Sequence, residues 1–339
     1  MRTSLSVAYR PHTWDQVVGQ ESIMLILKKQ LSSNSFKNTY IFSGASGCGK
    51  TTIARLFAMA INKDRGTPIE IDGASNSGVD NVRQIVESAK ERSIDSEYKI
   101  YIIDECHALS NQAWQAFLKC IEEPPKYTIF IFCTTDPHKI PDTIKNRCMR
   151  FNFSRIESDL IYNRLLYICE QESFTNYNNA CDYISRICNG ELRNAISLLE
   201  TCADYNTDLD INNVVYALGN YSYDIYFKLV NSIIDGNTKE CFNILSNIYK
   251  SGSVLEKFVD SFLDFNIDIT KYLLCENIGV TKFPISVEND LKFCTAFDNA
   301  SNYYFYIIDR LLELKQMIKS DSNVKSTIEV MFSKMCRLV

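Results

Sequence analysis

Residues 44–52 read Gly-Ala-Ser-Gly-Cys-Gly-Lys-Thr-Thr, and this stretch decides the fold. It matches the phosphate-binding pattern G-x-x-x-x-G-K-[ST] at every fixed position. Residues 40–43 before it form a short apolar segment typical of a strand, and residues 51–61 after it have helical periodicity. Glycines let the backbone wrap around phosphate groups, and a helix N-terminus directs positive partial charge at them. The stretch therefore predicts a nucleotide site.

Nine consecutive residues form this predicted phosphate-binding loop. They are Gly44, Ala45, Ser46, Gly47, Cys48, Gly49, Lys50, Thr51 and Thr52. We expect Lys50 to neutralise the β- and γ-phosphates and the Thr51 hydroxyl to bind Mg²⁺. The alternative, a glycine-rich turn that caps an ordinary helix, is disfavoured by the strand and helix on either side.

A pair of adjacent carboxylates, Asp104 and Glu105, ends a second apolar segment at residues 99–105. Ligands of open α/β sheets bind at the carboxyl ends of the strands, where such a pair is delivered. We expect Asp104 to hold Mg²⁺ through water and Glu105 to polarise the attacking water. Two solvated acids at a strand end are the alternative, which the upstream loop makes less favourable.

Strand and helix patterns alternate through the first 154 residues. Further strands are predicted at 67–72, 127–135 and 151–153, and helices at 21–31, 81–92, 111–122 and 141–146. This alternation requires a parallel sheet with helices on both faces. Residues 7–20 are expected to form a non-helical arm, and Ser77 or Asp80 to cap the helix at 81–92. Thr135, at a strand end, fits a γ-phosphate sensor and a turn cap equally well.

The pattern becomes purely helical after residue 154. Helices are predicted at 160–172, 181–188, 191–199, 303–318 and 324–338, and no glycine-rich loop or histidine occurs beyond residue 220. The sequence therefore predicts three domains: an α/β nucleotide-binding domain (1–154), a small helical lid (155–219) and an all-α oligomerisation domain (220–339).

Composition excludes several classes of protein. The chain has 339 residues, a formal net charge of −5 and 46% hydrophobic residues, which is ordinary for a globular protein and too acidic for a general nucleic-acid coat. No apolar run approaches the ~20 residues of a membrane span, so no membrane partner is expected. Thirteen cysteines never form Cys-x-x-Cys and only three histidines exist. We therefore expect a reduced, cytoplasmic protein without zinc.

Several runs carry a resemblance to one family. They are Tyr-Arg-Pro at 9–11, Val-Val-Gly-Gln at 17–20, residues 42–52, Ile-Glu-Ile-Asp-Gly-Ala-Ser-Asn-Ser-Gly-Val-Asp at 69–80, Tyr-Ile-Ile-Asp-Glu-Cys-His-Ala-Leu-Ser at 101–110, Leu-Lys-Cys-Ile-Glu-Glu-Pro-Pro at 118–125, Thr-Thr-Asp-Pro-His-Lys-Ile-Pro at 134–141, Asn-Arg-Cys at 146–148 and Gly-Glu-Leu-Arg-Asn-Ala at 190–195. The sequence resembles the γ/τ ATPase subunit of the bacterial DNA polymerase III clamp loader, a member of the AAA+ superfamily, densely over about residues 7–200.

The resemblance implies roles that spacing alone does not. Thr135 is expected to be sensor 1, Arg147 the arginine finger that reaches the ATP of a neighbouring subunit, and Arg193 sensor 2 in the lid. The residues expected around the adenosine are Tyr9, Arg10, Pro11, Val17 and Val18. From its position alone, Arg147 is a surface arginine before a strand.

Further expectations from the resemblance concern partners. They are primer–template DNA, a sliding clamp and other clamp-loader subunits in a pentameric ring or spiral. The implied DNA-contacting residues are Asn76, Gly78, Arg83 and Ser110, and Ala108 and Leu109 are candidates for clamp contact. By pattern alone, Arg83 fits a solvated helix residue and the apolar pair fits the core.

The sequence departs from the family at a few positions. Asn146 stands where Ser is usual, Cys106 stands where Val is frequent, and residues 62–67 replace a zinc-binding cysteine insertion. The chain also lacks the long τ tail, and this compact form leaves a bacterial or a phage origin open.

The favoured function is that of an ATPase subunit of a clamp loader. A non-hydrolysing stator subunit is disfavoured by the intact Lys50, Thr51, Asp104 and Glu105. Another P-loop enzyme, such as a kinase or a DNA-remodelling AAA+ ATPase, is the remaining alternative.

Overall fold

The fold is described from a computed structural model that covers residues 3–218, 223–250, 254–283, 287–319 and 323–337. The chain divides into two compact units. The first consists of Met1–Leu165 with Cys188–Ser197, and the second of Leu166–Ile187 with Leu198–Val339. The predicted domain boundary at 154/155 lies inside the first unit, and the one at 219/220 lies outside the described residues. The three-domain division stays a prediction.

A five-stranded parallel sheet forms the centre of the first unit, as predicted. Its strands are β1 (Thr39–Gly44), β2 (Ile69–Asp72), β3 (Lys99–Asp104), β4 (Thr128–Thr134) and β5 (Met149–Phe153), in the spatial order β2-β3-β4-β1-β5. All four pairings are parallel. Every residue of β4 is buried, because helices cover both faces of the sheet.

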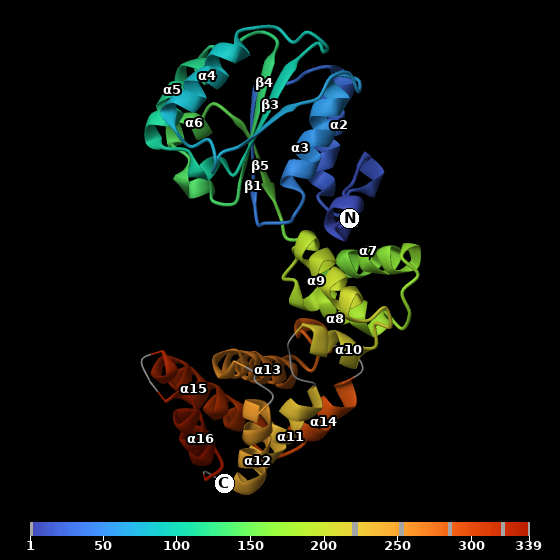
Figure 1. Ribbon diagram of the computed structural model, residues 1–339, viewed down its shortest axis with the longest axis vertical. Helices are drawn as coiled ribbons and strands as arrows, with labels where there is room; N and C mark the ends of the chain where they lie inside the picture. The colour runs from blue at the N-terminus through green and yellow to red at the C-terminus, as the bar shows by residue number, and fades with distance from the viewer. Residues whose placement is uncertain (1–2, 219–222, 251–253, 284–286, 320–322, 338–339) are drawn as a thin grey trace. The chain divides into compact units, whose positions relative to one another are not determined.

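Helices cover the sheet in two layers (Figure 1): α2 (Glu21–Ser33) and α3 (Lys50–Ile61) on one face, and α4 (Val79–Ala89), α5 (Asn111–Glu122) and α6 (Asp142–Lys145) on the other. The short helix α1 (Leu5–Ala8) belongs to the N-terminal arm. Tyr40 and Phe42 of β1 pack with α2 and α3, whereas Ile41 between them packs with α4 and α5. This alternation is the two-residue period of a strand, and it produces one core on each face.

Two local predictions are wrong. The arm at 7–20 is not free of helix, since α1 extends to Ala8 and residues Trp14–Gln16 form a 3₁₀ turn. Neither Ser77 nor Asp80 caps α4. Gly78 occupies the N-cap position in an extended conformation and supplies no side-chain cap.

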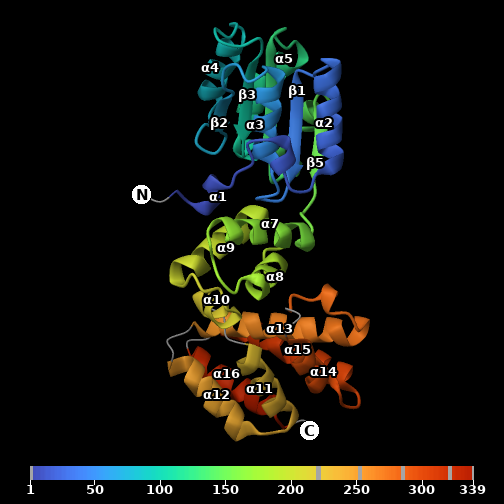
Figure 2. The same ribbon diagram turned by 90° about the vertical axis from the view of Figure 1, so that its right-hand side faces the viewer.

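Helices follow one another through the rest of the described residues, as predicted (Figure 2). They are α7 (Ser158–Gln171), α8 (Asn178–Ile187), α9 (Leu192–Tyr205), α10 (Ile211–Ala217), α11 (Tyr223–Ile234), α12 (Thr238–Lys250), α13 (Leu255–Cys275), α14 (Glu288–Thr295), α15 (Ala300–Ile318) and α16 (Val324–Met335). Phe258, Phe262 and Phe265 of α13 share one helical face and are buried in the core of the second unit. Helix α13 packs along α15.

Candidate nucleotide site

The phosphate-binding loop turns through left-handed backbone conformations between β1 and α3. Gly47 has φ +65°, and a Cβ added there would lie 3.1 Å from the Arg193 Cβ. A Cβ on Gly44 would collide with the carbonyl of Phe153 on β5. These two positions therefore require glycine for conformation and for close approach. The same geometry places the start of α9 directly against the loop.

Lys50 begins α3 and is only 6% exposed. Its Nζ atom donates to the carbonyl oxygens of Gly44 at 2.9 Å and of Ala45 at 2.7 Å. The loop's own carbonyls thus satisfy a buried cation, as burial of a charge requires. An anionic ligand in the loop offers the ammonium group a stronger partner.

The acidic pair lies beside the loop, as the sequence predicts. The Thr51 hydroxyl donates to Asp104 Oδ2 at 2.8 Å. Mg²⁺ prefers hard oxygen donors such as hydroxyl and carboxylate groups. The side chains of Thr51 and Asp104 are therefore suitable ligands for Mg²⁺. Glu105 follows with φ +46°, a left-handed backbone that is uncommon for a residue with a side chain.

A single cavity of about 130 Å³ joins these parts. The predicted residues that line it are Tyr9, Arg10, Pro11, Val17, Val18, Ser46, Gly47, Cys48, Gly49, Lys50, Thr51, Thr52, Asp104, Glu105 and Arg193. Gly44 and Ala45 do not line the cavity, but their carbonyl oxygens accept hydrogen bonds from Lys50, which does. All the lining residues belong to the first unit.

Four further lining residues are absent from the sequence prediction. They are Ser6, Ile156, Leu192 and Ile196. Leu192 and Ile196 lie four residues apart on α9 and therefore on one face of that helix. Because Arg193 lies between them in the sequence, helical spacing around Arg193 could have predicted both residues. Ser6 and Ile156 leave no such signal, because only the folded chain brings α1 and the segment after β5 to the loop.

Two of the predicted catalytic residues, Thr135 and Arg147, lie outside this cavity. The Thr135 hydroxyl donates to Glu105 Oε2 at 3.2 Å, which connects Thr135 to the acidic pair. Arg147 forms an ion pair with Glu122 at 2.7 Å and donates to the carbonyl oxygen of Thr143. The structure therefore does not bring Arg147 to the nucleotide cavity of its own chain.

The candidate DNA-contacting residues gather where α4 and α5 begin. The amide of Ser110 donates to the carbonyl oxygen of Ser77 at 3.2 Å, which places the N-termini of the two helices side by side. Asn76 and Gly78 precede α4, and Arg83 is exposed and paired with Asp80.

The candidate clamp contacts divide between core and surface. Leu109 is 7% exposed and packs in the core between the sheet and α5. Of the apolar pair, only Ala108 is half-buried and partly open to solvent.

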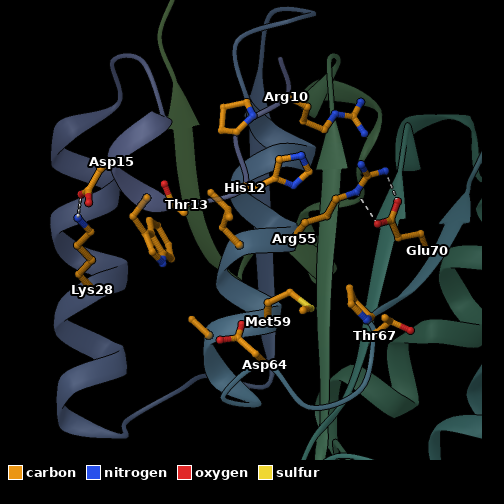
Figure 3. A pocket seen from close by; sticks show the side chains of 15 residues that line it. Arg10, His12, Thr13, Asp15, Lys28, Arg55, Met59, Asp64, Thr67 and Glu70 are labelled. Atoms are coloured by element: carbon orange, nitrogen blue, oxygen red, sulfur yellow. Dashed lines mark hydrogen bonds and ion pairs between the residues drawn. The ribbon is translucent and has the colours of Figure 1, made fainter. Parts of the chain in front are cut away.

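A larger cavity of about 770 Å³ lies on the other side of the arm (Figure 3). Arg55 and Glu70 pair on one wall, and Lys28 lies near Asp15 on the opposite wall. Arg10 and Pro11 line both cavities, so the arm separates the two.

Burial raises the pKa of the Cys48 thiol in the phosphate loop, although the charge of Lys50 acts in the opposite direction. Cys48 is 1% exposed, and its Sγ donates to the carbonyl of Ala45 at 2.9 Å. Cys48 is therefore a neutral, packed thiol and part of the loop scaffold.

Metal-binding clusters and membrane helices are both missing from the part of the chain that the structure describes. No group of three or more His, Cys, Asp or Glu side chains there can hold a metal ion. No described helix is both long and apolar enough to cross a bilayer. The expectation that the chain binds no zinc stays a prediction.

The fold and the site together define a class of protein. The phosphate-binding loop follows β1, and the acidic pair stands at the end of β3, which β4 separates from β1 in the sheet. A helical segment, the start of α9, lies against the loop. This is the arrangement of AAA+ proteins. Among solved structures, the Thermotoga maritima RuvB Holliday junction branch migration motor has this fold. It aligns with a TM-score of 0.53 and 19% identity over 67% of this chain and 80% of that chain.

Sequence comparison gives the family. The chain is 32% identical to DNA polymerase III subunit gamma of Buchnera aphidicola (subsp. Acyrthosiphon pisum) over 77% of this chain and 78% of that protein. It is 32% identical to DNA polymerase III subunit tau of Bacillus subtilis over 97% of this chain. The family model for the DNA polymerase III delta subunit matches residues 68–157. The chain belongs to the DNA polymerase III gamma/tau family.

Some relatives are considerably longer than this chain. The match covers 62% of the Bacillus subtilis protein, and it covers 49% of the gamma/tau subunit of Mycoplasma genitalium, to which the chain is 34% identical. The activities and partners of those longer proteins are therefore proposals for this chain.

Proposed function

We propose that this chain is an ATP-hydrolysing subunit of a sliding-clamp loader. One observation carries the proposal: the loop, the acidic pair, the N-terminal arm and Arg193 line one cavity. In this proposal Lys50 binds the β- and γ-phosphates, Arg193 contacts the nucleotide from α9, and residues 9–11, Val17 and Val18 surround the adenosine.

When a nucleotide binds, the Lys50 ammonium group exchanges the carbonyl oxygens of Gly44 and Ala45 for phosphate oxygens, which carry more negative charge. The arm and the start of α9 line the same cavity, so a bound nucleotide contacts both.

Catalysis is assigned to the residues around Asp104. Thr51 and Asp104 would hold Mg²⁺, which neutralises phosphate charge when bound. Glu105 orients and polarises the attacking water, and Thr135 holds the carboxylate of Glu105 by the 3.2 Å hydrogen bond. These side chains supply positions and charges, which is the protein's main contribution to phosphoryl transfer.

Arg147 is proposed to act on the nucleotide of a neighbouring subunit. It lies outside the cavity of its own chain and forms an ion pair with Glu122 in which both side chains are 41% exposed. An exposed ion pair of this kind contributes little to stability, so Arg147 can exchange Glu122 for a phosphate at low cost. An arginine supplied by a neighbour makes hydrolysis depend on assembly.

The DNA and clamp assignments follow from the same assembly. Two adjacent helix N-termini at Gly78 and Ser110, with Asn76 and Arg83 nearby, can bind backbone phosphates without reading sequence. We propose that ATP binding orders a ring or spiral of subunits around primer–template DNA and an open clamp, and that hydrolysis releases both.

Steady-state ATP hydrolysis tests the proposal. The chain is assayed alone, with primer–template DNA, with the clamp, and with both, in the presence of the other loader subunits of its source. Stimulation by DNA and clamp together, lost in Arg147→Ala and kept in Arg150→Ala, supports the proposal. Hydrolysis that is indifferent to both additions contradicts it and favours another AAA+ motor, whereas ATP binding without hydrolysis in the full assembly favours a stator.

A further inference from the structure

His107 lies close to the same oxygen of the candidate catalytic carboxylate that Thr135 contacts. Its Nδ1 atom lies 3.2 Å from Glu105 Oε2 and 3.2 Å from Thr134 Oγ1. The imidazole belongs to the 3₁₀ turn Cys106–Ala108 and is 22% exposed, whereas the Glu105 side chain is 42% exposed. The carboxylate oxygen therefore has two side-chain neighbours, one on each of two segments.

The position of the histidine proton follows from these distances. If Nδ1 carried no proton, its lone pair would face an ionised carboxylate oxygen at 3.2 Å, and the two acceptors would repel each other. With a proton on Nδ1, the ring donates to Thr134 Oγ1 at 3.2 Å and turns its positive N–H edge toward Glu105 Oε2, whereas a Thr134 hydroxyl that donated to Nδ1 would leave the lone pair facing that oxygen. Thr134 Oγ1 also accepts from the amide of Asp136 at 3.0 Å, which fixes that hydroxyl in place.

The backbone conformation of Glu105 is uncommon and depends on contacts with neighbouring residues. Its φ of +46° is a left-handed conformation that costs of order 1 kcal/mol for a residue with a Cβ, and it is kept only where surrounding contacts determine it. The amide of Glu105 donates to Asp104 Oδ1 at 3.0 Å, so the same turn also orients Asp104. His107, which follows within this turn, anchors the other end of the Glu105 side chain.

We propose that His107 is a positioning residue for Glu105. Its Nδ1–H group and the Thr135 hydroxyl together hold the carboxylate in the orientation that polarises water. His107 does not line the nucleotide cavity, and its two side-chain neighbours at Nδ1 are Glu105 and Thr134, so its effect on the reaction passes through Glu105. The inference rests on the proposed ATP hydrolysis, and it assigns that reaction a residue beyond the acidic pair.

Two amide replacements separate this role from simple packing. Asparagine in His107→Asn places its NH₂ group close to the position of Nδ1, whereas glutamine in His107→Gln places it close to Nε2. We expect kcat to fall about tenfold in His107→Ala and in His107→Gln, and to stay within threefold in His107→Asn, with the affinity for ATP unchanged in all three. Equal activity in the three variants would overturn the inference. His138→Ala, an exposed histidine, is the matched control.

The tautomer provides a readout that does not depend on activity. Because the chain has three histidines, ¹⁵N-labelled histidine gives a spectrum that His107→Asn assigns directly. At pH 8, His107 is expected as the Nδ1–H tautomer, and this preference is expected to be lost in Glu105→Ala. An Nε2–H tautomer in the unsubstituted protein would overturn the inference, whatever the hydrolysis assay shows.

The two experiments distinguish failure of the proposed ATP hydrolysis from failure of the proposed role of His107. Absent hydrolysis with an Nδ1–H tautomer removes the proposed function and leaves the His107–Glu105 contact standing. Normal hydrolysis with an Nε2–H tautomer removes only the role of His107.

Discussion

We propose that nucleotide binding depends on Lys50 more than on any other residue of the loop. Its ammonium group is buried and donates to two loop carbonyls. An anion that replaces these carbonyls gains a charge-assisted hydrogen bond from a buried ammonium group.

Substituting Lys50 tests that dependence. Lys50→Met keeps the length and the buried stem but removes the charge, so we expect ATP affinity to fall at least about 100-fold while the far-UV spectrum is unchanged. Equilibrium binding of a fluorescent ATP analogue measures the effect. Lys139→Met, an exposed lysine on the 3₁₀ turn after β4, is the control. Equal affinities in the two variants would exclude Lys50 as a phosphate ligand.

Gly47 and Gly49 form a matched pair in the same loop. Both have positive φ, at +65° and +101°, but only Gly47 has a close neighbour, since a Cβ at Gly49 meets nothing within 4 Å. We expect Gly47→Ala to lower the free energy of unfolding by about 1 kcal/mol more than Gly49→Ala, because the new methyl group presses on Arg193. Urea unfolding without nucleotide measures both. Equal losses would mean that α9 does not rest on the loop.

Among the elements, α4 and α5 show what periodicity can and cannot predict. The predicted helix at 111–122 has the observed bounds, because Ser110 caps it and Pro124 follows its end. Helix α4 begins at Val79, before the predicted start, because Gly78 and the Ser77–Ser110 backbone contact set its N-terminus. Such long-range contacts leave no trace in a local pattern.

The cap of α5 has a measurable effect. The Ser110 hydroxyl accepts a hydrogen bond from the Ala113 amide at 3.1 Å. We expect Ser110→Ala to cost about 1 kcal/mol in the free energy of unfolding, and Ser110→Asp to restore most of it because aspartate also caps.

The control for this experiment is Ser32→Ala on α2, where the hydroxyl donates to a helical carbonyl and caps nothing. We expect its effect to stay within about 0.5 kcal/mol. A loss of that small size in Ser110→Ala as well would refute the cap.

For the whole molecule, thiol burial predicts sensitivity to alkaline pH. Burial raises the pKa of Cys148 to about 11 and of Cys202 to about 12, and it holds those of Cys106 and Cys133 further above the ordinary 9.0. Above pH 9 the unfolded chain releases these protons and the folded chain keeps them. Stability therefore falls as pH rises, by about 1.4 kcal/mol per thiol for each pH unit.

Urea unfolding under reducing conditions from pH 7.5 to 10 measures this loss. It should be smaller in Cys133→Ala, which removes one buried thiol, and unchanged in Cys275→Ser, because Cys275 is exposed. A free energy of unfolding that stays flat up to pH 10 would contradict the prediction.

Much of the site could be predicted because its chemistry is local in sequence. The loop and the acidic pair each lie within a few consecutive residues, and parallel topology brings the ends of β1 and β3 to one edge. Three features could not be predicted, because each depends on how the folded chain packs. They are the position of Ile156 in the cavity lining, the ion pair of Arg147 with Glu122 and the proximity of His107 to Glu105.

Clamp transfer in the complete assembly is the experiment on which the proposed function depends. Labelled clamp, primed circular DNA and the remaining loader subunits are mixed with the chain, and clamp retained on the DNA is counted with ATP, without nucleotide and with Lys50→Met. We predict retention that requires ATP and is lost in the variant. Equal retention without ATP, or full retention with Lys50→Met, would contradict the proposal that ATP bound in this cavity drives clamp loading.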